Sequence, residues 1–144
     1  MNELKNKFTL FLEIFIMYFI NKSRDYILVD VRQALESLLE EKDKINIYDN
    51  NNYNNYNNEN KIINNIININ MLYKECYKKA TEEKFIYACA DIDSIVIHYN
   101  KQLCEYDIFI PLCNAIIELA NDFNYPNNNN NILAIKEFIE TKKF

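Results

Sequence analysis

The chain has a net charge of −5 and contains no glycine. Its length of 144 residues gives room for one domain over residues 1–144 with a single core. The negative charge argues against nucleic acid and anionic membranes as partners, because both would need clustered lysine and arginine, and it leaves a protein as the expected partner. Phosphate-cradling loops need residues that tolerate positive φ, which only asparagine or aspartate could supply here, so we expect no such loop.

The first apolar segment, residues 8–20 (FTLFLEIFIMYFI), is apolar almost all round, which indicates a helix packed deep between other helices. It is too short to cross a bilayer and carries Glu13 in its middle, and no apolar tail closes the chain, so we expect no membrane anchor. No small-residue cleavage site follows the segment, which argues against a secretion signal.

Residues 25–43 have the pattern of an amphipathic second helix, with Leu28, Val31, Leu35 and Leu38 spaced three and four apart. We expect the acidic residues on and near its polar face to be solvated charge: Glu36, Glu40, Glu41 and Asp43. Residues 46–60 are dominated by asparagine and tyrosine without apolar periodicity. Asparagine competes for its own backbone, so this segment is predicted to be one long mobile loop.

Two further apolar stripes follow the loop. Residues 62–80 predict a third helix, with its charged residues on the opposite, solvated face: Lys74, Glu75, Lys78 and Lys79. Residues 85–99 have apolar side chains on two sides, which predicts the central helix of the fold. No segment alternates convincingly between apolar and polar residues, so we expect sheet content close to nil.

The last part of the chain predicts two more helices. Asp107 is placed to cap the first of them, and Pro111 is tolerated in its first turn. Its expected buried face consists of Phe109, Leu112, Cys113, Ile116, Leu119, Ala120 and Phe123. Residues 132–139 predict a short final helix, with Lys142 and Lys143 at the negative end of its dipole. The expected fold is therefore all-α, a compact bundle of six or seven helices with one long Asn-rich loop.

The sequence offers little for catalysis. Asp91, Ser94 and His98 are spaced to share one face of the predicted central helix, but side chains on one straight helix do not converge on a substrate carbonyl. The four cysteines form no CxxC pair, so we interpret them as small buried thiols rather than metal ligands: Cys76, Cys89, Cys104 and Cys113. We expect no enzyme activity, no cofactor and no metal.

Two regions carry a resemblance to a known family. The first is KFTLFLEIFIMY (residues 7–18), followed by LLEEKDKINIY (38–48), and the second is EEKFIYACADIDSIVIHYNKQ (82–102). The second continues into DIFIPLCNAIIELANDF (107–123) and NILAIKEFIETKKF (131–144). Together these hydrophobic patterns resemble the poxviral Bcl-2-like family of intracellular immunomodulators, in its innate-immune-signalling inhibitor branch.

The resemblance implies a Bcl-2-like bundle in the host cell cytoplasm that binds host signalling adaptors or kinases and inhibits NF-κB and interferon induction. Some members are homodimers through the first and sixth helices. Carried over to this chain, the possible dimer or partner interface consists of Ile16, Tyr18, Phe19, Glu105, Tyr106 and Ile108. The glycine-containing signature and the tail anchor of cellular Bcl-2 proteins are both missing.

Two other functions stay open. The chain could be an anti-apoptotic groove binder that captures pro-apoptotic death helices, which present apolar anchors at helical intervals. It could also be a helical subunit of a protist assembly, since the chain is rich in Asn, Ile, Lys and Tyr, whose codons are AT-rich and suggest an AT-rich genome. An obligate subunit should expose a large apolar patch when it is alone.

Overall fold

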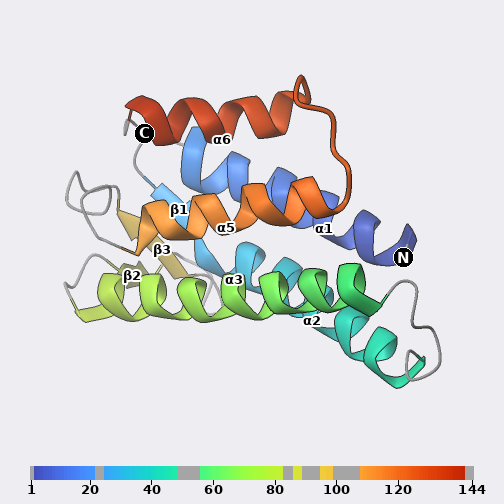
Figure 1. Cartoon of the computed structure of the whole chain (residues 1–144). Coiled ribbons are helices and arrows are strands. Elements are labelled where there is room, and N and C mark those ends of the chain that lie inside the picture. The colour runs from blue at the N-terminus through green and yellow to red at the C-terminus, as the bar shows by residue number, and fades with distance from the viewer. Residues whose placement is uncertain are drawn as a thin grey trace.

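The computed structural model describes residues 2–21, 25–48, 56–82, 86–88, 95–98 and 108–141. These residues contain five α-helices rather than the six or seven predicted. They also contain a π-helix that directly continues α1, and three short strands (Figure 1). The bounds are α1 Asn2–Phe15, η1 Ile16–Asn21, β1 Asp25–Ile27, α2 Leu28–Tyr48, α3 Tyr56–Glu82, β2 Ile86–Ala88, β3 Ile95–His98, α5 Phe109–Asp122 and α6 Asn130–Thr141.

The core is helical, which confirms the all-α character of the fold. Its described residues come from the helices and η1, apart from Phe123 directly after α5. In Figure 1, α6, α5 and α3 follow one another from top to bottom, and α1 and α2 lie behind them. Helix α1 packs on α2, and α3 packs on α5. The prediction that residues 8–20 lie deep in the fold is confirmed for one face, on which Phe8, Phe11, Leu12 and Phe15 are fully buried. On the other face, Leu10 and Met17 are exposed.

A chain of aromatic rings runs through this core. Phe15 stacks on Phe19 with ring centroids 5.1 Å apart, and Phe19 lies 5.8 Å from Phe109. Phe109 meets Phe138 edge to face at 5.2 Å. Offset and edge-to-face contacts of this kind add stability beyond the burial of apolar area. The rings therefore join α1, η1, α5 and α6 into one unit.

Helices α2 and α3 extend into both ends of the segment predicted to be the asparagine-rich loop. Residues 46–48 belong to the end of α2 and residues 56–60 to the beginning of α3, so only residues 49–55 of the predicted loop lie outside the described residues. Asparagine disfavours helix, but intrinsic propensity is a weak force that tertiary burial overrides. A buried stripe within the predicted residues 62–80 supplies that burial: Ile62, Ile66, Ile69, Tyr73 and Cys76.

The predicted central helix over residues 85–99 is wrong. Its described parts are β2 and β3, which pair antiparallel with each other, and β3 also pairs antiparallel with β1 in the order β1-β3-β2. Ile97 of β3 lies opposite both Tyr26 and Ile86. A short apolar run fits helix and strand alike, and the consecutive β-branched residues Ile95, Val96 and Ile97 favour strand. Among the described residues the sheet content is low, as predicted, but two of the three strands lie within the segment predicted to be this helix.

Asparagine takes the place of glycine between α5 and α6. Asn124 has a positive φ of 61°, and the amide of Tyr125 donates to the carbonyl of Ala120 at 3.1 Å, as in a Schellman turn. The side chain of Asn129 then caps α6 by accepting from the amides of Asn131 at 2.9 Å and Ile132 at 3.3 Å. The turn and the cap together set the direction in which α6 returns.

Helix α5 begins at Phe109 and has no side-chain cap from its N-cap residue, Ile108. Pro111 lies in the first turn, as predicted, and every residue of the predicted buried face of α5 is buried. The proposed cap Asp107 and the basic pair Lys142 and Lys143 lie outside the described residues. Among the described helices, none combines the length and apolar character that crossing a bilayer requires.

Candidate functional site

A groove of about 340 Å³ lies between α2 and α3. Each helix contributes four side chains at positions i, i+3, i+4 and i+7, which is one face over two turns. The lining residues are Arg32, Leu35, Glu36 and Leu39 from α2, and Asn70, Tyr73, Lys74 and Tyr77 from α3. The groove follows directly from the way these two helices meet.

The floor of the groove is apolar. Leu35 and Tyr73 are buried there, and Leu39 and Tyr77 are partly buried against the core. Burial raises the pKa of the Tyr73 phenol above its ordinary value, while the positive charge of Arg32 opposes the shift. A phenol is already neutral at physiological pH, and this shift in pKa keeps Tyr73 neutral at higher pH as well, so the floor carries no charge from this side chain.

The rim of the groove is charged. Arg32 Nε lies 3.2 Å from Glu36 Oε1, and the two side chains are 64% and 56% exposed. An exposed i,i+4 pair of this kind contributes only about 0.3–0.5 kcal/mol, so a ligand can compete for either partner. Lys74 is exposed and makes no ion pair within the described part of the chain. The rim therefore carries two cations and one anion.

The predicted interface residues do not form one exposed surface. Ile16 and Phe19 are buried in the core, so their side chains cannot meet a second copy without rearrangement. Tyr18 is partly exposed and donates a hydrogen bond to the carboxylate of Asp30, which raises the pKa of Tyr18. Ile108 is partly buried against the core, while Glu105 and Tyr106 lie outside the described residues. The dimer itself stays a prediction.

The prediction of a solvated side chain is wrong for Glu41. Glu36, Glu40 and Asp43 are exposed, but Glu41 is only 8% exposed. Its carboxylate lies 3.1 Å from Lys44 Nζ. Position 41 follows Leu38 by three residues and therefore belongs to the buried stripe of α2 rather than to its solvated face. The charged residues predicted on the outer face of α3 are exposed where they are described: Lys74, Glu75 and Lys78.

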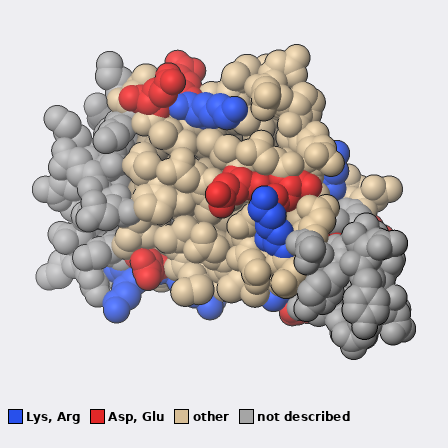
Figure 2. All heavy atoms as spheres, in the orientation of Figure 1, with Lys and Arg blue, Asp and Glu red and all other residues tan. Residues whose placement is uncertain are grey.

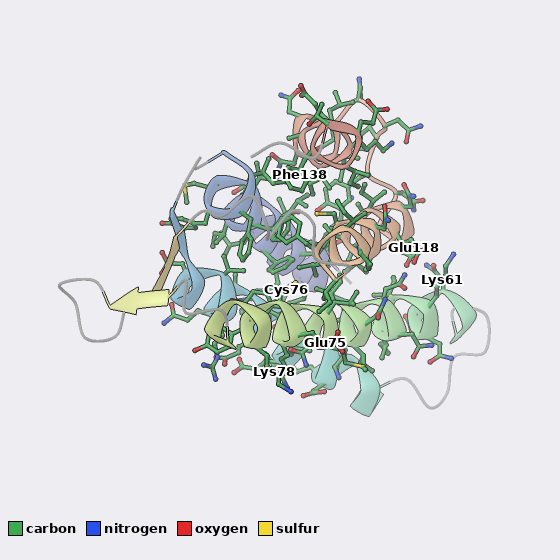
Figure 3. The ribbon with its side chains drawn as sticks, turned by 90° about the vertical axis from the view of Figure 1, so that its left-hand side faces the viewer. Lys61, Glu75, Cys76, Lys78, Glu118 and Phe138 are labelled. Carbon is green, nitrogen blue, oxygen red and sulfur yellow. The ribbon has the colours of Figure 1, made fainter. Side chains whose placement is uncertain are left out.

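The two described cysteines, Cys76 and Cys113, are buried, as predicted. Cys76 points from α3 into the interior, whereas Glu75 and Lys78 point away from it (Figure 3). Burial raises the pKa of the Cys76 thiol to about 12, which leaves it protonated and inert. Cys89 and Cys104, like Asp91 and Ser94, lie outside the described residues. His98 belongs to β3 rather than to a helix, with Asp25 as its strand partner.

Two polar clusters tie helices together elsewhere. Asn65 of α3 donates a hydrogen bond to Asp122 at the end of α5, and Lys61 forms an ion pair with the same carboxylate. Tyr125 hydrogen-bonds the hydroxyl of Thr9, and Lys5 Nζ lies 5.2 Å from the Tyr125 ring centroid. Each cluster joins two segments that are far apart in sequence. We assign both to stability, because their groups are satisfied by one another.

Charged side chains are sparse and scattered on the face in view in Figure 2, over α3, α5 and α6. The described residues contain no group of three or more His, Cys, Asp or Glu side chains that could hold a metal ion. Large exposed apolar side chains occur on α1, η1, α3 and α6, singly or in pairs: Leu10, Met17, Ile67, Met71 and Leu133. Scattered apolar residues of this kind are normal on a protein surface.

The groove between α2 and α3 is not evident in the sequence. Leu35 belongs to the apolar stripe predicted in residues 25–43, and Tyr73 lies in the helix predicted over residues 62–80. Nothing in the sequence marks Asn70 and Tyr77 as their neighbours at the surface. The equal spacing of the two stripes is the signal that the sequence contains, and it becomes visible only when α2 and α3 are known to pack together. The chain matches no protein-family model, no curated protein and no solved structure.

Proposed function

We propose that this protein is a non-catalytic binding module that engages a host signalling protein through the groove between α2 and α3. The observation that carries the proposal is the combination of an apolar floor, built on Leu35 and Tyr73, with a charged rim. Buried apolar anchors supply most of the binding energy of protein interfaces, and polar rims exclude water around them. The groove has an apolar floor and a charged rim, and it is large enough for a few side chains of a partner.

The identity of the partner comes from the resemblance to poxviral Bcl-2-like immunomodulators. On that basis the partner is a host adaptor or kinase, the place is the host cell cytoplasm, and the result is reduced NF-κB or interferon induction. A Bcl-2-like arrangement of the helices is part of the proposal. The helical core supports it, while the strands at residues 86–88 and 95–98 occupy the region where such a bundle would have its central helix.

A reporter assay in host cells tests the function. Cells that express the full chain should show lower NF-κB- and interferon-driven reporter signals after stimulation than cells with an empty vector. Asn70→Trp fills the groove from a partly exposed position, whereas Asn64→Trp adds the same bulk to an exposed position of α3 outside it. We expect Asn70→Trp to lose the inhibition and Asn64→Trp to keep it, at equal protein levels.

Unchanged reporter signals with the wild-type chain would contradict the signalling function. Inhibition that survives Asn70→Trp would leave the function standing but exclude the groove as its site.

Capture of pro-apoptotic death helices is a second candidate. The observation that favours it is that α2 and α3 each line the groove with residues at helical spacing. Such a surface suits the apolar anchors of an amphipathic helix. Isothermal titration with death-helix peptides separates the two candidates. Sub-micromolar binding to the wild-type chain that is lost in Asn70→Trp would favour the death helix, and no binding would favour the signalling partner.

A further inference from the structure

We infer that the groove recognises a short acidic segment of its partner, in which a carboxylate lies beside one large or two smaller apolar anchor side chains. This inference rests on the proposed function and gives the chemistry of the partner at the same site. Three properties of the groove carry it, namely its size, its floor and its rim.

The size of the groove limits the number of anchors. A volume of about 340 Å³ lies near the lower end of the range for small-molecule pockets. Such a volume holds one large side chain or two smaller ones and leaves the rest of a bound segment on the surface. The binding energy must then be concentrated in those side chains, as in the hot spots of protein interfaces.

The floor determines the kind of anchor. Leu35 and Leu39 present aliphatic surface from α2, and Tyr73 and Tyr77 present aromatic rings from α3. Aromatic rings prefer offset or edge-to-face neighbours, and aliphatic side chains pack against either. The Tyr73 side chain is an uncharged phenol buried in the floor, so its ring can pack against an apolar neighbour with no charge to desolvate. A leucine or an aromatic side chain satisfies these conditions.

The rim determines the sign of the charge beside the anchor. Glu36 is already paired with Arg32, whereas Lys74 makes no ion pair within the residues that the structure describes. A carboxylate at the rim would meet Lys74 directly and could share Arg32. A basic group would meet Lys74 as a like charge. The whole chain carries a net charge of −5, so its overall field attracts basic peptides, and any preference for acidic ones must be local to the groove.

Peptide selection on the full chain tests the inference without knowledge of the natural partner. Random peptides of about 12 residues displayed on phage are selected on the immobilised wild-type chain, with counter-selection on Asn70→Trp. We expect the enriched peptides to place Asp or Glu within a few positions of Leu, Phe or Trp. Fluorescence polarisation then compares one enriched peptide with its variant in which lysine replaces the acidic residue.

Charge reversal at two lysines supplies the matched comparison. Lys74→Glu changes the rim, whereas Lys78→Glu makes the same change at an exposed position of α3 that does not line the groove. We expect Lys74→Glu to raise the Kd of the acidic peptide by about fivefold. Lys78→Glu should change this Kd by less than about twofold. The lysine-substituted peptide should bind the wild-type chain more weakly than the acidic peptide does.

Several results would overturn the inference. They are the absence of groove-dependent peptides, enrichment of basic peptides, or equal losses in Lys74→Glu and Lys78→Glu. Self-association of the pure chain that Asn70→Trp abolishes would identify a second copy as the occupant and would also overturn it. The reporter assay is independent of these peptides, so inhibition of signalling without acidic selectivity would reject this inference while the proposed function stands.

Discussion

The ammonium group of Lys61 in α3 lies 3.5 Å from the carboxylate of Asp122, the last residue of α5. The Asp122 side chain is only 5% exposed, and a carboxylate at a helix C-terminus meets the negative end of the dipole. The charge of Lys61 and the hydrogen bond from the Asn65 amide offset the cost of burying this carboxylate and its repulsion by the helix dipole. This small cluster holds the beginning of α3 against the end of α5.

Removal of the lysine should therefore destabilise the fold. We expect Lys61→Met to lower the free energy of unfolding by about 1 kcal/mol, because Lys61 is 67% exposed and solvent screens part of the pair. Lys78→Met removes an exposed lysine from the same helix and should change stability by less than about 0.5 kcal/mol. Urea denaturation measures both. Equal effects of the two substitutions would contradict the role given to the cluster.

The turn after α5 depends on the backbone of Asn124. At φ 61° a β-branched residue is strained, so Asn124→Val should cost about 1–2 kcal/mol of unfolding free energy. Asn124→Gly removes the strain and should be neutral or slightly stabilising. Thermal unfolding of the three proteins checks the order. A valine variant as stable as the wild type would show that this turn is not held in the left-handed region.

Phe19 is a core residue, although the resemblance placed it in a dimer interface. It is stacked on Phe15 and close to Phe109, so Phe19→Ala should lower the free energy of unfolding by about 3–5 kcal/mol. Leu10→Ala, at an exposed position, should cost far less. Chemical denaturation gives the stabilities, and light scattering gives the mass. Loss of self-association in Phe19→Ala without loss of stability would favour the dimer interface instead.

The buried thiol of Cys76 predicts a pH dependence of stability. Its pKa is raised from 9.0 to about 12 in the folded chain, so between these values the unfolded thiol loses its proton and the folded one keeps it. The free energy of unfolding therefore falls as the pH rises through this window, by at most about 1.4 kcal/mol per pH unit for this group.

Urea denaturation between pH 8 and pH 10.5 measures that slope. Cys76→Ala removes the thiol and should show a shallower decline above pH 9, whatever its stability at neutral pH. Tyr73 has a raised pKa as well and remains in both proteins, so the slopes are compared rather than the absolute values. Parallel slopes in the two proteins would mean that Cys76 ionises equally in both states.

Much of the helical core could be predicted from the sequence. The buried stripes of α1, α3 and α5 follow from apolar side chains at helical spacing, because one face of each helix must leave water. A chain without glycine must place asparagine or aspartate wherever a positive φ is needed, and Asn124 is such a position. These features depend on local pattern, which one sequence contains.

The structure differs from the sequence-based prediction where an apolar pattern fits two kinds of element, or where the packing of one element on another decides the outcome. The β-branched run at residues 95–97 fits helix and strand alike by periodicity, and the strand forms where residues 96–98 pair with residues 25–27. Glu41 lies on the buried stripe of α2, but charge alone suggested solvent. The groove depends on how α2 and α3 meet, and no periodicity within one helix specifies that contact.

The most direct test of the groove is to map a bound peptide on the full chain by nuclear magnetic resonance. The isotope-labelled protein is titrated with the acidic peptide selected on it, and backbone shifts are followed residue by residue. We predict that the largest changes fall on residues 32–39 and 70–77, with little change on the exposed face of α6. Changes centred on α1 or α6, or none at all at saturating peptide, would contradict a binding function at this groove.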